Sequence, residues 1–226
     1  MVLANAIYFK GSWVLPFEKN RTRDEPFHLE AGGKVNAPLM RRKAEISYMR
    51  GEGFQAVDLG YRGGDLSMLI LLPDRVDGLR ELEEKISPRV LSDYVAAMQA
   101  HEVDCLIPRF KFTLGAINLR EPLAKLGLSL PFDRTAADFS GINGLRPPDF
   151  DALYVSAVFQ KAFVEVNEEG TEAAAATGAV LGLAMAPAPR QAVEFRADHP
   201  FVFAIRDRKS GEILFIGRVV DPTREG

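Results

Sequence analysis

Cysteine and histidine are scarce in this chain of 226 residues, which has one cysteine, Cys105, and three histidines, His28, His101 and His199. A single cysteine excludes an internal disulfide and leaves the cellular compartment open. No histidine or cysteine cluster has the spacing of a metal site, and the G-x-S-x-G sequence of a nucleophile elbow is missing. The sequence therefore predicts no metal, no cofactor and no catalytic constellation of its own.

Long apolar runs and a strong net charge are also missing. No stretch of about 18 apolar residues occurs, and the N-terminus lacks a basic region followed by an apolar core. We therefore expect neither a membrane partner nor a signal peptide. The net charge of −3 gives no indication of a nucleic-acid partner. The one basic triplet, Arg41-Arg42-Lys43, is typical of a solvated strand end.

What the chain does contain is many strand-like runs, with 47% hydrophobic residues to bury. Runs at Glu45–Arg50, Phe54–Tyr61 and Leu66–Leu72, separated by glycine-containing turns, predict an antiparallel meander. Helical periodicity covers Leu79–Ile86 and Arg89–Ala100, which Ser87-Pro88 separates. Further strands are expected at Val2–Phe9, Val103–Ile107, Asp151–Val166, Ala192–Phe195, Phe201–Ile205 and Ile213–Val220, and a helix at Asn118–Leu126. We expect the Val2–Phe9 and Asp151–Val166 strands to be buried.

The stretch from Glu168 to Thr177 has two possible structures. Thr171 could cap a short helix formed by the alanines that follow it, since threonine is a fair N-cap and alanine the best helix former. The same stretch also fits a strand, because Thr171, Ala173, Ala175, Thr177, Ala179 and Leu181 would share one face that carries no charge. The stretch can thus be an exposed loop or a central strand.

This stretch resembles the hinge and reactive-centre loop of the serpins, inhibitors whose loop inserts into their own β-sheet. The resemblance continues in family order through the whole chain, in the blocks Asn5–Trp13, Leu69–Pro73, Ile107–Phe110, Ala137–Ile142, His199–Phe201 and Gly217–Pro222. It implies an α+β, serpin-like fold with large mixed and antiparallel sheets, few helices and a long exposed reactive loop.

The resemblance implies a single, incomplete domain over residues 1–226, with hinge and reactive-centre loop at 168–190. The family's N-terminal helical part has no counterpart here, and Met1 falls within what resembles a central strand of the main sheet. The chain thus resembles the C-terminal portion of a serpin. A fragment, a misplaced gene start and a natural truncation all fit.

The resemblance also assigns site residues. The reactive bond would be Ala184–Met185, sixteen residues after Glu168, with Leu183 and Met185 as alternative positions before the bond. The "breach" at the top of the sheet would contain Trp13 and an ion pair of Arg109 with Glu168. The "shutter" beneath the sheet would contain Asn5 hydrogen-bonded to Gln160, where most serpins carry histidine. The hinge itself would be formed by Glu168, Glu169, Gly170, Thr171, Glu172, Ala173, Ala174, Ala175, Ala176 and Thr177.

The implied function is suicide-substrate inhibition of serine proteases with elastase-like specificity. The partner would be a target serine protease held as a covalent acyl complex, and we expect a monomer that can form loop–sheet polymers. The target class favours an extracellular location, while a cytoplasmic one stays open. The alternative is a non-inhibitory or truncated interaction module that is merely cleaved as a substrate. The small hinge residues argue against this alternative, and the missing N-terminal part argues for it.

Overall fold

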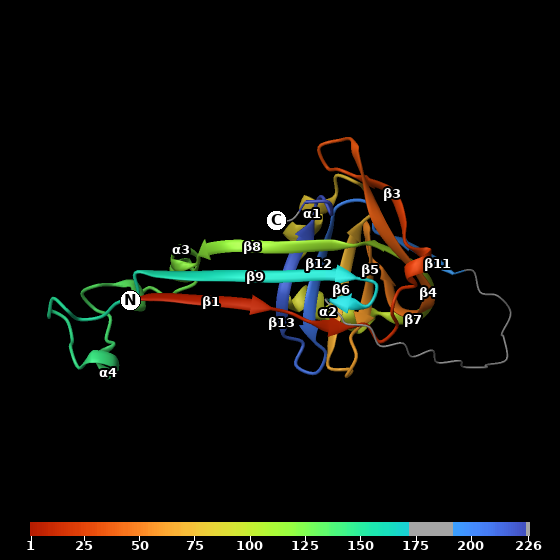
Figure 1. The fold of residues 1–226 in the computed structure, drawn as a ribbon. Helices are drawn as coiled ribbons and strands as arrows, with labels where there is room; N and C mark the ends of the chain where they lie inside the picture. Colours follow the sequence, from red (N-terminus) through yellow and green to blue (C-terminus); the bar gives the residue numbers. More distant parts are fainter. Residues whose placement is uncertain (172–191, 225–226) are drawn as a thin grey trace. The chain divides into compact units, whose positions relative to one another are not determined.

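The computed structural model describes residues 1–171 and 192–224 (Figure 1). Within these residues the chain has the predicted α+β fold, with two large sheets and short helices. It divides into two compact units, one formed by residues 1–9 and 112–164, the other by residues 10–111 and the described residues from 165 onward.

The first unit is organised by three long strands. Strand β9 (Ala157–Asn167) lies between β1 (Val2–Tyr8) and β8 (Phe110–Asn118) (Figure 1). Strands β1 and β9 are parallel, in a register that runs from Val2 opposite Ala157 to Tyr8 opposite Phe163. The short helices of this unit are α3 (Arg120–Lys125), η2 (Leu130–Phe132) and α4 (Ser140–Asn143).

The strand at Val2–Tyr8 is confirmed, but its predicted burial is wrong. All of its residues are exposed except Ile7, which is partly buried. Among the described residues, β1 has a hydrogen-bonded neighbour on one edge only, so apolar composition alone does not bury it. Burial on β9 is likewise incomplete, because only Val164 and Val166 are fully buried.

The second unit contains an eight-stranded sheet among the described residues, in the order β11-β7-β4-β5-β6-β12-β13 with β3 paired to β4. The predicted meander is confirmed, and the last two strands pair as an antiparallel hairpin. The strands of this unit are β2 (Gly11–Ser12), β3 (Arg23–His28), β4 (Lys34–Arg50), β5 (Phe54–Gly60), β6 (Leu66–Pro73), β7 (Gln99–Pro108), β10 (Gly170–Thr171), β11 (Val193–Arg196), β12 (Phe201–Asp207) and β13 (Ile213–Val219).

Two helices, α1 (Leu79–Lys85) and α2 (Pro88–Ala97), pack on this sheet, and a 3-10 turn, η1, covers Lys19–Arg21. The predicted break between the helices is confirmed, since the Ser87 side chain accepts a hydrogen bond from the Val90 amide and Pro88 begins α2. The apolar core joins Leu82 and Leu91 of the helices to Leu69 and Leu71 of β6. This strand is buried over nearly its whole length, as its continuous apolar run predicts.

The basic triplet at 41–43 lies in the middle of β4, and its predicted solvation is wrong at Arg42. Arg41 and Lys43 form surface ion pairs with Asp104 and Glu102. Successive strand residues point to opposite faces, so Arg42 points inward and is 5% exposed. Its guanidinium lies 4.6 Å from the centroid of the Phe17 ring, and burial lowers its pKa.

Candidate functional site

The start of the hinge is held by backbone hydrogen bonds to residues 11–17. After β9 ends, the chain turns at Glu168-Glu169, and Gly170 pairs with both Asn167 of β9 and Ser12 of β2. The amides of Trp13 and Phe17 donate to the carbonyls of Glu169 and Glu168, at 2.9 and 2.8 Å. The first hinge residues are therefore already part of the sheet.

Gly170 fits a position that no other residue can occupy without movement of the backbone. Its φ is +144°, which side chains of L-residues rarely allow. A Cβ placed on Gly170 would lie 2.0 Å from the carbonyl oxygen of Gly11. The close approach of β10 to β2 thus depends on glycine at this position.

Trp13 connects the hinge to the second unit's core. Its side chain is fully buried, and its indole N–H donates to the Asn167 carbonyl at 3.0 Å. The indole stacks on the Tyr61 ring, with centroids 4.5 Å apart and planes 14° apart. The Tyr61 hydroxyl in turn shares a 2.8 Å hydrogen bond with the hydroxyl of Thr171, which is also fully buried. Thr171 is thus a buried strand residue in β10, and burial raises the pKa of Tyr61.

The carboxylate of Glu168 is the most densely hydrogen-bonded group of the hinge. It is 3% exposed, and both of its oxygens accept from Nε of Arg109 at 2.9 Å. Nη2 of Arg109 and the hydroxyl of Thr22 each donate to Oε1 at 2.5 Å. Burial by itself would raise the pKa of Glu168, but the hydrogen bonds from Arg109 and Thr22 outweigh it, so that the pKa lies below its usual value.

The structure thus brings together five residues that the sequence assigned to one region, namely Trp13, Arg109, Glu168, Gly170 and Thr171. The expected contact of Arg109 with Glu168 is present. Sequence reasoning missed Tyr61 and Thr22, whose hydroxyls complete the cluster and which belong to no local motif. We call these seven residues the hinge anchor. The remaining assigned hinge residues Glu172, Ala173, Ala174, Ala175, Ala176 and Thr177, and the assigned bond Ala184–Met185, lie outside the described residues.

Asn5 and Gln160 are neighbours in the register of β1 and β9. Asn5 is exposed, however, and Gln160 is only partly buried, so their predicted burial under the sheet is wrong. The structure contains no hydrogen bond between these two side chains, both of which are described. The physical reason is that β1 has a hydrogen-bonded neighbour on one side only among the described residues, which leaves the Asn5 amide accessible to water.

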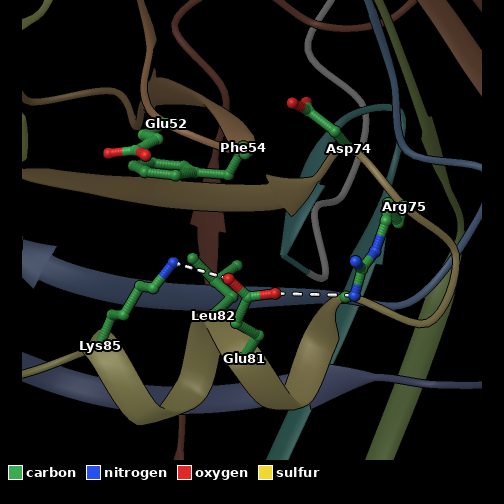
Figure 2. A pocket seen from close by; sticks show the side chains of 9 residues that line it. Glu52, Phe54, Asp74, Arg75, Glu81, Leu82 and Lys85 are labelled. Atoms are coloured by element: carbon green, nitrogen blue, oxygen red, sulfur yellow. Dashed lines mark hydrogen bonds and ion pairs between the residues drawn. The ribbon is translucent and has the colours of Figure 1, made fainter.

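A cavity of about 390 Å³ opens between the turn before β5 and helix α1 (Figure 2). Phe54 and Leu82 form its apolar walls, and Glu81 lies between Lys85 and Arg75, at 2.9 and 3.6 Å. The lining contains no serine, cysteine or histidine, and its charged side chains are three carboxylates and two cations, partly joined in ion pairs. The cavity therefore has the composition of a salt-bridged surface cleft and provides no nucleophile.

His199, which directly follows Asp198, has a structural environment. Its Nε2 lies 2.7 Å from the Pro73 carbonyl oxygen, and its Nδ1 lies 3.0 Å from Oδ1 of Asp198. Burial lowers the pKa of His199, but the hydrogen bonds to Asp198 and Pro73 raise it further, for a net increase. The contact with Pro73 connects the segment just before β12 to the last residue of β6.

Within residues 1–171 and 192–224, no cluster of three metal-ligating side chains occurs. In the same described ranges, no helix has the length and apolar character needed to cross a bilayer.

Comparison with known proteins gives the same family throughout. A family model described as "Serpin (serine protease inhibitor)" matches residues 1–222. Serpin-ZXA from Oryza sativa subsp. japonica is 42% identical over 228 residues, which is 98% of this chain and 56% of the relative. Leukocyte elastase inhibitor from Equus caballus is 40% identical over 230 residues, again 98% of this chain and 58% of the relative.

Among solved structures, uncleaved ovalbumin matches with a TM-score of 0.79 and 30% sequence identity, over 98% of this chain and 54% of that structure. The chain thus spans about half the length of the curated relatives it matches. Because the family model covers nearly all of its residues, this chain belongs to the serpin family.

Proposed function

We propose that this chain inhibits serine proteases by being cleaved in its reactive loop. The protease forms an acyl-enzyme at the loop, and the hinge then enters the sheet as a strand before the ester is hydrolysed. The protease supplies the nucleophile and the oxyanion hole, and this chain supplies the cleavable loop and the conformational change.

The observation that carries this proposal is the pairing of Gly170 and Thr171 with the end of β9. Gly170 lies opposite Asn167 and Thr171 opposite Val166, in an antiparallel register. If the chain continues in this register after cleavage, Ala173 comes opposite Val164 and Ala175 opposite Ala162. The hinge strand then replaces β1 as the neighbour of β9.

The same register explains why the hinge residues are small. Thr171 and Val166 are buried, and so is Val164, so a hinge inserted in this register would direct alternate residues from Thr171 onward to the interior. Alanine at positions 173 and 175 adds no charge that has to lose its water during insertion. Thr177 would come opposite Gln160, next to Asn5. The assigned shutter pair would therefore lie where the hinge inserts between β1 and β9.

The hinge anchor serves in this proposal as the lock that keeps the loop outside the sheet. Arg109 and Thr22 hold the Glu168 carboxylate, and the Trp13 and Tyr61 side chains hold the backbone and hydroxyl groups that follow. A broken contact here would let the hinge enter before cleavage.

We further propose that Ala184–Met185 is the bond cleaved and that the target protease has elastase-like specificity. A small apolar residue before the bond fits the pocket of such enzymes, and one relative is named for inhibition of leukocyte elastase. Leucine at 183 or methionine at 185 before the bond would shift the preference toward chymotrypsin-like enzymes.

The test is incubation of the purified chain with pancreatic elastase, followed by a denaturing gel and N-terminal sequencing. We expect a band that contains both proteins and a released peptide that begins at Met185. Complete cleavage without a joined band would overturn inhibition. A different new N-terminus would overturn only the assignment of the bond.

The second candidate function is a serpin-shaped interaction module that proteases cleave as an ordinary substrate. It is favoured by one observation, that the chain spans about half the length of its relatives. Repeating the incubation with a chain extended upstream distinguishes the two candidate functions. If only the longer chain forms a covalent complex with the protease, the 226 residues alone act as the interaction module.

A further inference from the structure

A second cavity, of about 220 Å³, lies beside the hinge anchor and shares no lining residue with the cavity at α1. All of its lining belongs to the second unit. It comes from Pro38 of β4, from 109–111 where β7 gives way to β8, from 165–167 at the end of β9, and from 222–224 after β13. Pockets for drug-sized ligands measure about 300–1,000 Å³, so this cavity suits a smaller molecule.

The charged side chains that line this cavity are mostly cationic. They are those of Arg109, Lys111 and Arg224, together with one carboxylate, that of Glu165. The lining thus carries a formal charge of +2, in a chain whose net charge is −3. A cavity walled by an excess of one sign of charge attracts a ligand of the opposite sign, which here is an anion.

Arg109 has a donor edge that the hinge anchor does not use. Its Nε and Nη2 donate to Glu168, whereas Nη1 donates no hydrogen bond within residues 1–171 and 192–224. The Arg109 side chain is also 45% exposed, although its partner is 3% exposed. A guanidinium is planar and has several N–H donors in fixed directions, so it can bind one oxyanion through Nε and Nη2 and another through Nη1 and Nη2. The second edge of Arg109 is therefore available to a ligand of the cavity.

Arg224 is held at this cavity by a turn with a buried carboxylate. The Asp221 side chain accepts hydrogen bonds from the amide and the hydroxyl of Thr223, at 3.0 and 2.6 Å. Its other oxygen pairs with Nε of Arg224 at 3.1 Å. Asp221 is only 9% exposed, so these contacts fix the segment 222–224. The arginine is thus placed by the fold, and its two terminal nitrogens can contact a ligand.

We propose that this cavity binds a small phosphate-type dianion, held by the Nη1 edge of Arg109 and by the terminal nitrogens of Arg224. A tetrahedral oxyanion can accept hydrogen bonds from several donors at once, and its charge matches the excess charge of the lining. The ligand is either free phosphate or the phosphate group of a small monoester. This site does not depend on protease inhibition.

The site shares Arg109 with the hinge anchor. The bound dianion and the Glu168 carboxylate are attracted to the same guanidinium and repel one another. Each therefore weakens the binding of the other, and this coupling is reciprocal. A ligand in the cavity would loosen the Arg109–Glu168 contact, and removing the charge of Glu168 would tighten ligand binding.

The test is isothermal titration calorimetry of the chain at low ionic strength, with inorganic phosphate and, separately, with phenyl phosphate. We expect saturable binding with a dissociation constant of about 1 mM or lower, which weakens as sodium chloride is added. Tighter binding of inorganic phosphate would assign the free ion as ligand, and tighter binding of phenyl phosphate would assign a monoester. If neither probe binds saturably, the proposal is overturned.

The titration is repeated with a chain extended upstream. All of the lining comes from residues 38–224, so the longer chain should bind the same probe. Loss of binding in the longer chain would also overturn the proposal.

Three variants test where the ligand lies. Arg224→Glu should weaken binding at least about tenfold, because it replaces a donor with a repelling carboxylate and leaves the contacts of Glu168 in place. Arg89→Glu, at an exposed position in the first turn of α2, makes the same change in net charge and should bind as the unaltered chain does. Glu168→Gln should bind several-fold more tightly.

Equal affinities of Arg224→Glu and Arg89→Glu would place the ligand elsewhere and overturn the proposal. An unchanged affinity in Glu168→Gln would likewise overturn the shared use of Arg109. None of these outcomes changes the result expected with elastase.

Discussion

Reversing the charge of Glu168 should release the hinge anchor. The variant Glu168→Lys removes the carboxylate that accepts from Arg109 and Thr22 and places a second cation beside Arg109. Breaking a buried ion pair costs about 3–5 kcal/mol, because the remaining charge is left without a partner. Glu168 is 3% exposed while the Arg109 side chain is 45% exposed, which places this pair at the lower end. A loss of about 3 kcal/mol increases the population of released hinge on the order of 100-fold.

The neighbouring glutamate provides a matched control. Glu169 pairs with Lys19, and their side chains are 23% and 67% exposed. Exposed pairs contribute about 0–1 kcal/mol, so Glu169→Lys should release the hinge far less. Both variants carry the same change in net charge, and they differ only in which contact is lost.

The assay compares the two variants on native gels after mild heating, together with urea unfolding curves. We expect Glu168→Lys to form loop–sheet polymers at a lower temperature than Glu169→Lys and to unfold at lower urea. Equal behaviour of the two, or no polymer from either, would show that the Arg109–Glu168 pair is ordinary surface charge.

Acid should act on the same contact. The pKa of Glu168 is lowered in the folded chain, so its stabilising contribution is present above the unfolded-state pKa of about 4.5 and is lost as the pH falls through the folded value. Glu168→Gln should therefore remove part of the loss of stability below about pH 4.5. An unchanged acid profile in this variant would contradict the assignment.

Three further predictions follow from the register and the contacts. Ala175→Glu, at a position that would face the interior if the hinge inserts in the proposed register, should allow cleavage by elastase but abolish the covalent complex. Ala176→Glu, which would come opposite Lys161, should retain the complex, and equal complex yields on gels would refute the register. Gly170→Ala should lower the free energy of unfolding in urea by at least about 1–3 kcal/mol, because of backbone strain and the close contact with Gly11. A smaller loss would mean that β10 does not pack against β2. Because the pKa of His199 is raised in the folded chain, its protonation stabilises the fold fully below about pH 6.5, and this contribution is lost as the pH rises through the folded-state pKa. His199→Gln should therefore reduce the pH dependence of the melting temperature between about pH 6 and 8. An unchanged pH dependence in this variant would count against the prediction.

The strands and helices of the second unit could be predicted because their signals are local. Glycine turns separate the apolar runs of β4, β5 and β6, and Ser87-Pro88 marks the beginning of α2. The Arg109–Glu168 contact was predicted from the resemblance to serpins. No local pattern indicates it, since the two residues are 59 positions apart.

Features that depend on distant segments could not be predicted in this way. Tyr61 and Thr22 reach the hinge from 110 and 146 positions away, and nothing in their own neighbourhoods indicates a role there. The burial of Arg42 follows from the alternation of side chains along β4. Three consecutive basic residues suggested instead that all of them are exposed to solvent. The exposure of β1 depends on which strand pairs with it, and the composition of Val2–Tyr8 contains no information about that.

If this chain inhibits by the proposed route, elastase remains joined to it after cleaving the Ala184–Met185 bond. Intact-mass spectrometry of the denatured reaction mixture detects this joined species. We expect a species with the mass of the protease plus residues 1–184, less one water, and a separate peptide with the mass of residues 185–226. Free protease together with two cleaved pieces of the chain, and no joined species at any time point, would contradict it.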